Sequence, residues 1–384
     1  MRFDYFLKTK SLNNILKRLK NSTFKTTIPI STRNKLSYDL VNQVDRDRFL
    51  YDYTKAFYDE FVEPVVEEKL FDFEFCLLLF LEKKLNYSFF EVLYTFKNIK
   101  KGKRPETEIE NIIYNTIYAY EFIKMPKIVL DENNFEMFVH ILLQNLDFDL
   151  DIKTNYYRSP TDKTIVENTL SVSDIDSEFN ALFDYLKDMD SKMLSGYTQA
   201  YILFIAVMLI SPFKSYNLTF STLFTQWFSF QRNESKKIVI PLYQIAKNWN
   251  NFNDNINNLI NEELDVNQTL NTIKHYYVEN INFYYHASHI YKWILKDRKN
   301  RMWIFEDDQT FILLVLMLQK TENLSLSSIK NLLTINKIKL LSDQELEKIL
   351  DKLITKNVIQ KIGNQTIKYS FYDKDLEKAR FLVK

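Results

Sequence analysis

Hydrophobic side chains return every three or four positions along most of this 384-residue chain. This spacing places them on one side of a helix and predicts a series of amphipathic helices. The pattern is clear over residues 46–96 and 108–122, and it predicts another helix over residues 133–145 with Asn133 or Asn134 as its cap. We therefore expect a mainly α-helical protein.

The most apolar stretch lies in the middle of the chain. Residues 200–210 carry no charged side chain, and an apolar helical pattern resumes at Leu218 after a short polar segment. About twenty apolar residues are needed to span a bilayer, so this shorter stretch predicts a buried central helix and no membrane span. Pro212 ends the helix because proline has no N–H for the next helical hydrogen bond.

Two segments alternate with the period of a β-strand. Residues 153–172 predict a short hairpin around a proline turn, and residues 358–371 predict a second hairpin. Three helices are predicted directly before the second hairpin, and three helices followed by a hairpin are typical of a winged-helix module. The predicted division of the chain is an N-terminal helical region, a helical domain and a winged-helix module: residues 1–84, 85–298 and 299–384.

Charge and composition exclude several classes of protein. The 51 basic residues are balanced by 50 acidic ones, so no overall field attracts nucleic acid or a membrane surface. Cys76 is the only cysteine, which excludes an intramolecular disulfide and, with the lack of a signal-peptide pattern, favours a cytoplasmic location. Only three glycines are present, whereas phosphate-binding loops of the Walker or dinucleotide type need two or three close together.

The segment after the central helix resembles the catalytic motif of the Fic (Fido) family. That motif reads H-P-F-x-D/E-G-N-G-R-x-x-R, and it also follows a buried helix. Pro212, Phe213 and Asn217 match it. The remaining positions of the motif carry other residues: Ser211 for the histidine, Ser215 for the metal-binding acid, Tyr216 and Leu218 for the glycines, and Thr219 and Thr222 for the arginines.

Other parts of the chain resemble the family in the same order, over roughly residues 50–384. Tyr157-Arg158 is similar to the start of the family's flap hairpin, and Val139-His140 to the pair that precedes it. Glu91 resembles the glutamate of the family's inhibitory helix. Some members also end in a winged helix. The resemblance thus implies a Fic-like helical bundle with a β-hairpin flap and a C-terminal winged-helix module.

The resemblance implies transfer of AMP, or a related phosphate-containing group, to a protein hydroxyl, with ATP and Mg²⁺ as cofactors. The substitutions argue against that chemistry. Ser211 cannot replace a histidine as general base at neutral pH. Tyr216 and Leu218 place side chains where backbone must approach phosphate closely, and no arginine remains to balance its charge. Glu91 would have only Thr222 to engage.

We therefore predict a pseudoenzyme with no catalytic residue and no cofactor, which acts as a binding or regulatory module for a protein partner or as a homodimer. ATP and Mg²⁺ are expected only if the activity survives. The alternative is a divergent nucleotidyltransferase that uses some other residue as its base.

A second alternative is DNA binding by the winged helix, which needs basic residues on its third helix and its wing. Five lysines have this placement: Lys348, Lys352 and Lys356 on the helix, and Lys361 and Lys368 in the hairpin. Acidic residues share the helix, however, and residues 301–384 carry fourteen basic against eleven acidic side chains. A module that packs against protein or dimerises is favoured.

Histidine spacing suggests one candidate metal site. His275, His286 and His289 could share a helix face, and three histidines can bind zinc. No cysteine lies nearby, and Tyr and Asn surround them. We therefore predict that the chain has no metal site and that Cys76 is a buried thiol of the core.

Overall fold

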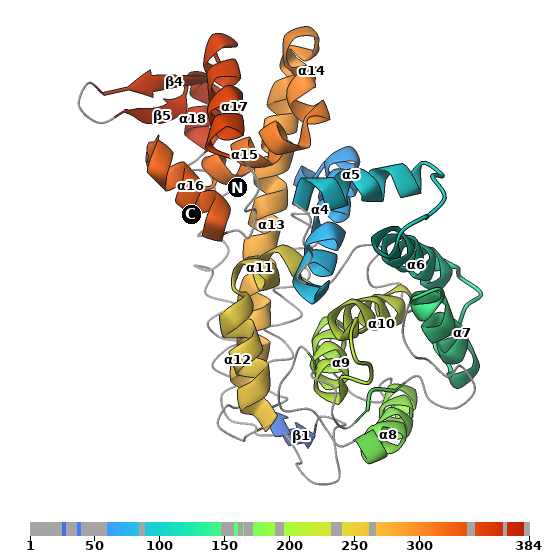
Figure 1. The fold of residues 1–384 in the computed structure, drawn as a ribbon. Coiled ribbons are helices and arrows are strands. Elements are labelled where there is room, and N and C mark those ends of the chain that lie inside the picture. Colours follow the sequence, from blue (N-terminus) through green and yellow to red (C-terminus); the bar gives the residue numbers. More distant parts are fainter. Residues whose placement is uncertain are drawn as a thin grey trace.

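The computed structural model describes residues 25–27, 37–39, 60–83, 89–146, 157–159, 164, 172–188, 196–231, 240–260, 266–335, 342–363 and 367–379. Within these ranges the chain is mainly α-helical, as the sequence predicts (Figure 1). The strands β1 (Lys25–Thr27) and β2 (Ser37–Asp39) pair in antiparallel fashion. Most of the predicted flap at 153–172 lies outside the described residues; those described, 157–159, 164 and 172, are not in a strand.

Four helices lie between residues 64 and 143. They are α4 (Pro64–Lys83), α5 (Phe89–Lys100), α6 (Glu108–Lys124) and α7 (Glu132–Leu143). Helix α6 starts at a capping box, in which Thr107 and Glu110 satisfy each other's backbone N–H groups. Helix α7 is capped by Asp131, whose side chain accepts from the N–H of Asn134. The predicted asparagine cap is wrong. The helix begins earlier than predicted, and the side chain of Asp131 accepts the hydrogen bond that the cap residue provides, so both asparagines lie inside the first turn.

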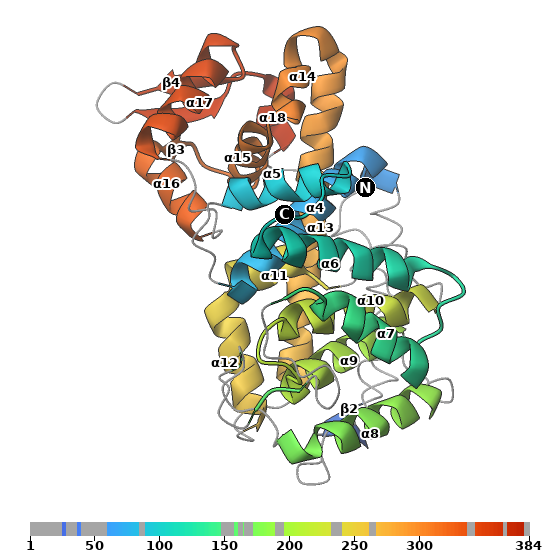
Figure 2. The same ribbon diagram turned by 45° about the vertical axis from the view of Figure 1, so that its right-hand side comes forward.

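Two buried helices lie at the centre of the helical part. Helix α9 (Gly196–Ile210) has no exposed residue from Ala200 onward, and α10 (Asn217–Gln231) is buried from Asn217 to Ser229. They pack against each other, while α4 and α6 cover α10 and α8 (Ile175–Asp188) lies nearby (Figures 1 and 2). No helix within the described ranges is long and apolar enough to cross a membrane.

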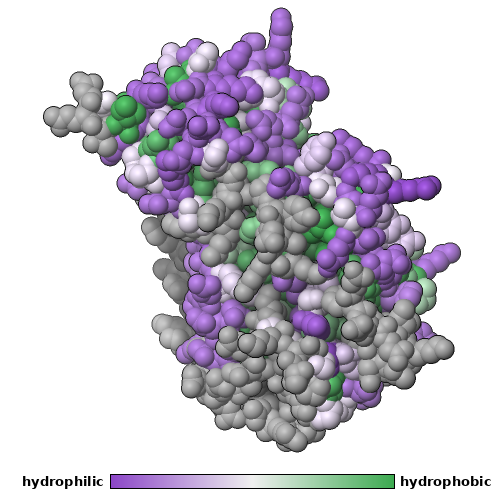
Figure 3. Space-filling view, viewed as in Figure 1, coloured by the Kyte–Doolittle hydropathy of each residue, from purple (hydrophilic) through white to green (hydrophobic). Residues whose placement is uncertain are grey.

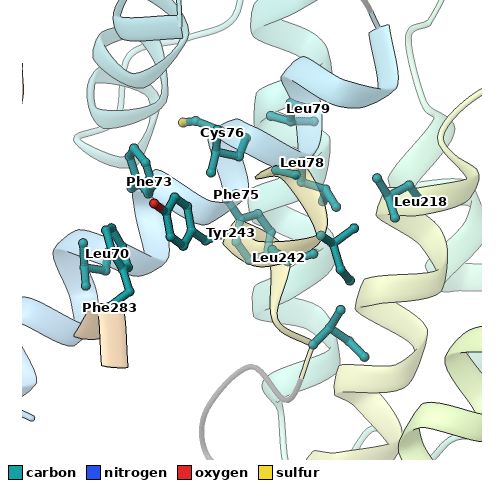
Figure 4. Packing of buried hydrophobic residues seen from close by; sticks show 14 of the residues in the cluster. Leu70, Phe73, Phe75, Cys76, Leu78, Leu79, Leu218, Leu242, Tyr243 and Phe283 are labelled. Atoms are coloured by element: carbon teal, nitrogen blue, oxygen red, sulfur yellow. The ribbon is translucent and has the colours of Figure 1, made fainter. Parts of the chain in front are cut away.

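Helix α4 connects the central pair to the rest of the core. Its buried residues Leu70 and Phe73 lie beside α11 (Leu242–Lys247) and α13 (Val266–Lys296), and Leu78 and Leu79 lie toward α10 (Figure 4). The 31-residue α13 runs the length of the molecule, with α12 (Trp249–Ile260) against its first half (Figure 1). The asparagine-rich α12 keeps Phe252, Ile256 and Leu259 on its buried side.

The C-terminal elements include the three predicted helices and the predicted hairpin, together with one more helix before them, a two-residue strand and a short helix after the hairpin. They comprise α14 (Arg298–Glu306), α15 (Asp308–Leu318), β3 (Leu324–Ser325), α16 (Leu326–Ile335), α17 (Asp343–Thr355), β4 (Ile359–Ile362), β5 (Lys368–Phe371) and α18 (Lys374–Ala379). The strands form an antiparallel sheet in the order β3-β5-β4. Hydrophilic side chains prevail on the described surface of this module (Figure 3).

The buried residues form one continuous hydrophobic cluster from Val62 to Ala379. Helix α4, from the predicted N-terminal region, packs against α5, α10, α11 and α13 within this cluster. The predicted boundary after residue 84 lies outside the described residues, and the one after residue 298 lies at the start of α14. The three-part division stays a prediction.

Candidate functional site

The loop that joins α9 to α10 carries the residues that resemble the Fic motif. Ser211, Phe213 and Asn217 are 0–2 % exposed, and Pro212 is buried with them; Lys214 alone is exposed in this loop. The Asn217 side chain accepts from Phe213 N at 2.9 Å and donates to Phe213 O at 2.6 Å. Asn217 therefore braces the loop against itself, which gives this matching residue a structural role.

Ser211 occupies the position that the resemblance assigns to a catalytic histidine. Its hydroxyl donates to the carbonyl of Met208 at 2.5 Å, and its N–H continues the ladder of α9 to Val207. Its φ of 41° lies in the left-handed region. The Ser211 hydroxyl thus satisfies a carbonyl in the last turn of α9. A serine hydroxyl cannot accept a proton from a substrate at neutral pH, so it does not act as a general base here.

Tyr216 has a conformation that favours glycine. Its φ is 70°, which costs a residue with a side chain about 1 kcal/mol or more. The resemblance places a glycine of the motif at this position. Here the left-handed backbone persists, while the tyrosine ring is buried in the core at 1 % exposure.

The predicted flap residues lie against this loop. The backbone N–H of Arg158 donates to Pro212 O at 2.8 Å, and its guanidinium Nε donates to Ser211 O at 2.8 Å. Arg158 is 6 % exposed, and the ring of Tyr157 stacks on Phe179 at 6.4 Å. The structure therefore brings together the flap-like segment and the loop that resembles the catalytic motif, which in the sequence were linked only because both resemble the same family.

Glu82 is the most informative residue of the site, and sequence analysis missed it. It lies at the end of α4, and its carboxylate receives the N–H of Leu218 at 3.0 Å and the N–H of Thr219 at 2.7 Å. The Thr219 hydroxyl adds a third hydrogen bond at 3.1 Å. Burial raises the pKa of Glu82 to about 7, while these hydrogen bonds act to lower it.

The start of α10 is therefore occupied by a carboxylate. Unpaired N–H groups and the helix dipole make a helix N-terminus a favourable site for an anion, phosphate included. Here those N–H groups bind an acid of the same chain. A short EKK run at a helix end looks like solvated surface, so the sequence carries no signal that Glu82 turns inward.

Glu91, the predicted inhibitory glutamate, has a different environment. It is exposed on the first turn of α5, whereas Thr222, its expected counterpart, is fully buried. The carboxylate at the start of α10 comes from α4 instead. The inhibitory role of Glu91 stays a prediction.

The five lysines of the predicted DNA-contact set have separate environments. The Lys352 ammonium lies 3.9 Å from the ring centre of Trp303 on α14, and Lys361 pairs with Asp351 at 3.6 Å. Lys356 caps the end of α17 and lines a polar cavity of about 870 Å³ between α14 and the C-terminal hairpin. Lys348 and Lys368 are exposed.

The candidate histidines do not assemble into a metal site. His275 is exposed beside Glu279, and His286 is buried with Nδ1 2.7 Å from Asn282 O. Burial lowers the pKa of His286 to about 4. In the described part of the chain, no group of three His, Cys, Asp or Glu side chains is placed to hold a metal ion. Cys76 is buried, and burial raises the pKa of its thiol.

Comparison with known proteins gives structural likeness only. No protein-family model matches the chain, and no curated protein matches its sequence. A Fic domain containing signaling protein from Bacteroides thetaiotaomicron is similar in structure, with a TM-score of 0.47, 13 % identity and coverage of 62 % of this chain and 97 % of that one. A Fic family protein from Desulfovibrio desulfuricans has a TM-score of 0.49, 12 % identity and coverage of 87 % and 97 %.

Proposed function

We propose that this chain is a Fic-like protein that has lost nucleotidyl transfer and acts as a binding or regulatory module. The single observation that carries the proposal is the carboxylate of Glu82 at the start of α10. In the family that this chain resembles, the same helix start receives the phosphates of the nucleotide. A tethered carboxylate that already accepts these N–H groups competes with any phosphate for them.

Two further features support the loss of transfer. Ser211 is buried and donates its hydroxyl to Met208, so the base required by the family's chemistry is lacking at that position. Thr219 and Thr222, where the motif has arginines, are buried and uncharged. A triphosphate would therefore meet a carboxylate and two hydroxyls, with no cation of the motif to balance its charge.

The experiment is a pair of assays on the wild-type chain and on Glu82→Ala. With radiolabelled ATP and Mg²⁺, neither protein should label itself or a mixed protein substrate, because neither contains the base. With ATP or inorganic pyrophosphate, Glu82→Ala should gain a thermal shift that the wild type lacks, because its helix start is then free to bind an anion. Glu68→Ala, at an exposed glutamate of the same helix, is the matched control.

If the chain is instead a divergent nucleotidyltransferase, the labelling assay should give the opposite result. The wild type would then transfer label, and restoring the motif with Ser211→His, Tyr216→Gly, Leu218→Gly and Thr219→Arg would lower the rate. Label transfer by the wild type would overturn the proposal of an inactive site.

For the C-terminal module, contacts within the protein favour a role in packing over DNA reading. Lys352 lies on Trp303, and Lys361 is paired with Asp351. DNA binding would require affinity that falls steeply with salt and weakens on Lys348→Glu. A gel-shift titration at two salt concentrations tests this alternative directly.

A further inference from the structure

A polar cavity of about 870 Å³ lies between the start of α14 and the C-terminal hairpin. Three segments line it: the junction of α13 with α14, the end of α17, and the turn from β5 into α18 (Figures 1 and 2). Small-molecule sites have volumes of about 300–1,000 Å³, so this cavity is large enough for an organic ligand. None of its lining residues belongs to the loop between α9 and α10, so it is separate from the site described above.

Arg301 lies in the wall of this cavity and has unused hydrogen-bond donors. Its guanidinium carbon is 3.9 Å from the ring centre of Trp293, and its Nη1 donates to the carbonyl of Trp293 at 3.2 Å. The two carboxylates that pair with it, Asp297 and Asp373, are 3.9 and 3.7 Å away, beyond hydrogen-bond distance. A guanidinium has five N–H groups in a rigid fork, so most of those of Arg301 remain available to a ligand.

The aspartates that line the cavity are already hydrogen-bonded within the protein. Asp373 accepts from an indole N–H and from the backbone N–H of Asp375, both at 2.8 Å. Asp297 accepts from the side-chain amide of Asn300 at 3.1 and 3.2 Å. Asp375 accepts from Nζ of Lys296 at 2.7 Å. These partners satisfy the carboxylates without using the free donors of the guanidinium.

Two further cations line the cavity. Within the described ranges, the ammonium groups of Lys356 and Lys374 have neither an ion pair nor a hydrogen bond. When Arg301 is added, together with Lys296, which pairs with Asp375 from outside the cavity, the cations outnumber the lining aspartates by one. A single net positive charge favours a monoanion. A phosphate dianion or a polyphosphate would exceed this charge and would be repelled by the aspartates.

We propose that this cavity binds a small organic acid that carries one carboxylate on a polar body. The Arg301 guanidinium binds the carboxylate, because its planar fork matches two carboxylate oxygens, and Lys356 and Lys374 add their charge. The stacking of Arg301 on Trp293 orients the fork before the ligand arrives, which lowers the entropy cost of binding. Uncharged polar residues in the lining suit hydroxyl groups on the body of the ligand: Asn300, Thr355, Asn357 and Tyr372.

The first test compares small molecules by isothermal titration calorimetry on the full-length chain at constant ionic strength. Gluconate, which has one carboxylate on a hydroxylated body, is the probe for the site. Sorbitol lacks the carboxylate, acetate lacks the body, and glucose 6-phosphate carries a dianion in place of the carboxylate. Each of these three should bind at least about tenfold more weakly than gluconate, because a charged hydrogen bond is lost or the charge no longer matches. The proposal is overturned if gluconate gives no measurable binding, or if any of the other three binds equally or more tightly.

The second test assigns the ligand to this cavity. Arg301→Ala should weaken gluconate binding by about tenfold or more. Lys374→Ala should weaken it severalfold, whereas Lys378→Ala, at an exposed lysine of the same helix outside the cavity, is the matched control and should bind as the wild type does. Circular dichroism checks that each variant is folded, and the two lysine variants decide the outcome if Arg301→Ala is not. Unchanged binding by Lys374→Ala, or equal losses for Lys374→Ala and Lys378→Ala, overturns the assignment.

Discussion

The carboxylate of Glu82, at the end of α4, accepts a hydrogen bond of 2.7 Å from the backbone N–H of Thr219 in the first turn of α10. The two residues are 137 positions apart in the chain. Glu74, two turns earlier on the same helix, accepts from the N–H of Tyr243 at the start of α11 and from Asn280 and Tyr284 of α13. Helix α4 thus supplies carboxylates to the beginnings of two other helices, from the buried Glu74 and the partly buried Glu82.

Glu82→Ala should destabilise the protein by about 1–3 kcal/mol, because it leaves the first N–H groups of α10 without an acceptor in a buried setting. Glu82→Gln keeps one of the two oxygen acceptors and turns its NH2 group toward the other N–H group, so it should cost less than Glu82→Ala without being neutral. Urea unfolding at a fixed pH near 7 measures both values. Equal losses for the two variants would show that the single acceptor kept by glutamine contributes nothing to stability.

The free energy of unfolding should fall as the pH rises from about 5 to 8. Burial raises the pKa of both Glu74 and Glu82 to about 7, above the value of about 4.3 for an unfolded chain. Between about pH 4.3 and about pH 7 each glutamate is protonated in the folded state and ionised in the unfolded state. The stabilisation that this difference gives at low pH is therefore lost as the pH rises through the folded pKa. The loss is up to about 3 kcal/mol for each glutamate.

His286 acts in the opposite direction over part of this range. Burial lowers its pKa to about 4, so its contribution to stability is lost as the pH falls from about 6.5 toward 4. Two glutamates oppose one histidine, so the free energy of unfolding should still fall as the pH rises. Above about pH 6.5 only the two glutamates, among these three groups, change the free energy of unfolding. Chemical unfolding of Glu74→Gln beside the wild type isolates one glutamate. The variant should show a shallower pH dependence, and an unchanged slope would contradict the buried, proton-holding state of Glu74.

Local patterns in the sequence were sufficient for the helices and for part of the site. The uncharged run at 200–210 and Pro212 define where α9 lies and ends, because burial and chain termination act on neighbouring residues. The likeness of Tyr157-Arg158 to one motif segment and of Pro212-Phe213 to another also led to a true contact, between Arg158 and the loop.

The sequence could not have predicted the partners of the buried charges. Glu82 belongs to a charged run that resembles solvated surface, and its partner follows 137 residues later. Glu91 fitted a family pattern better, yet it is exposed. The matching Asn217 proved to brace its own loop through Phe213. Which carboxylate faces a helix start depends on how α4 is oriented against α10, and local periodicity contains no information on that orientation.

Asp308, at the start of α15, links this helix to α4 and α5. Its carboxylate pairs with both Lys69 of α4 and Lys97 of α5, and the Lys69 ammonium lies 4.9 Å from the ring centre of Phe305. Burial lowers the pKa of Lys69, and Asp308 opposes that effect. Asp308→Ala leaves two cations together in this partly buried site and should destabilise the protein by about 2–4 kcal/mol.

The matched control for this variant is Asp375→Ala. Asp375 pairs with Lys296 at 2.7 Å, but both side chains are more than half exposed, so its removal should cost less than about 1 kcal/mol. Guanidinium chloride unfolding of the two variants and the wild type gives the comparison. Similar losses for Asp308→Ala and Asp375→Ala would show that the ion pairs of Asp308 with two lysines contribute no more to stability than an exposed ion pair.

Tyr216→Gly changes two contributions to stability in opposite directions: it relieves backbone strain and removes a buried aromatic ring. Glycine at φ 70° relieves about 1 kcal/mol of strain, but removing an aromatic ring that is 1 % exposed costs about 3–5 kcal/mol. The variant should therefore be less stable by about 2–4 kcal/mol, which explains how a tyrosine persists in a glycine conformation. Asn357→Gly provides the contrast, because Asn357 has a φ of 54° and an exposed side chain. It should gain up to about 1 kcal/mol. A stabilising Tyr216→Gly in thermal or urea unfolding would mean that the ring contributes less to the core than the strain it imposes on the loop.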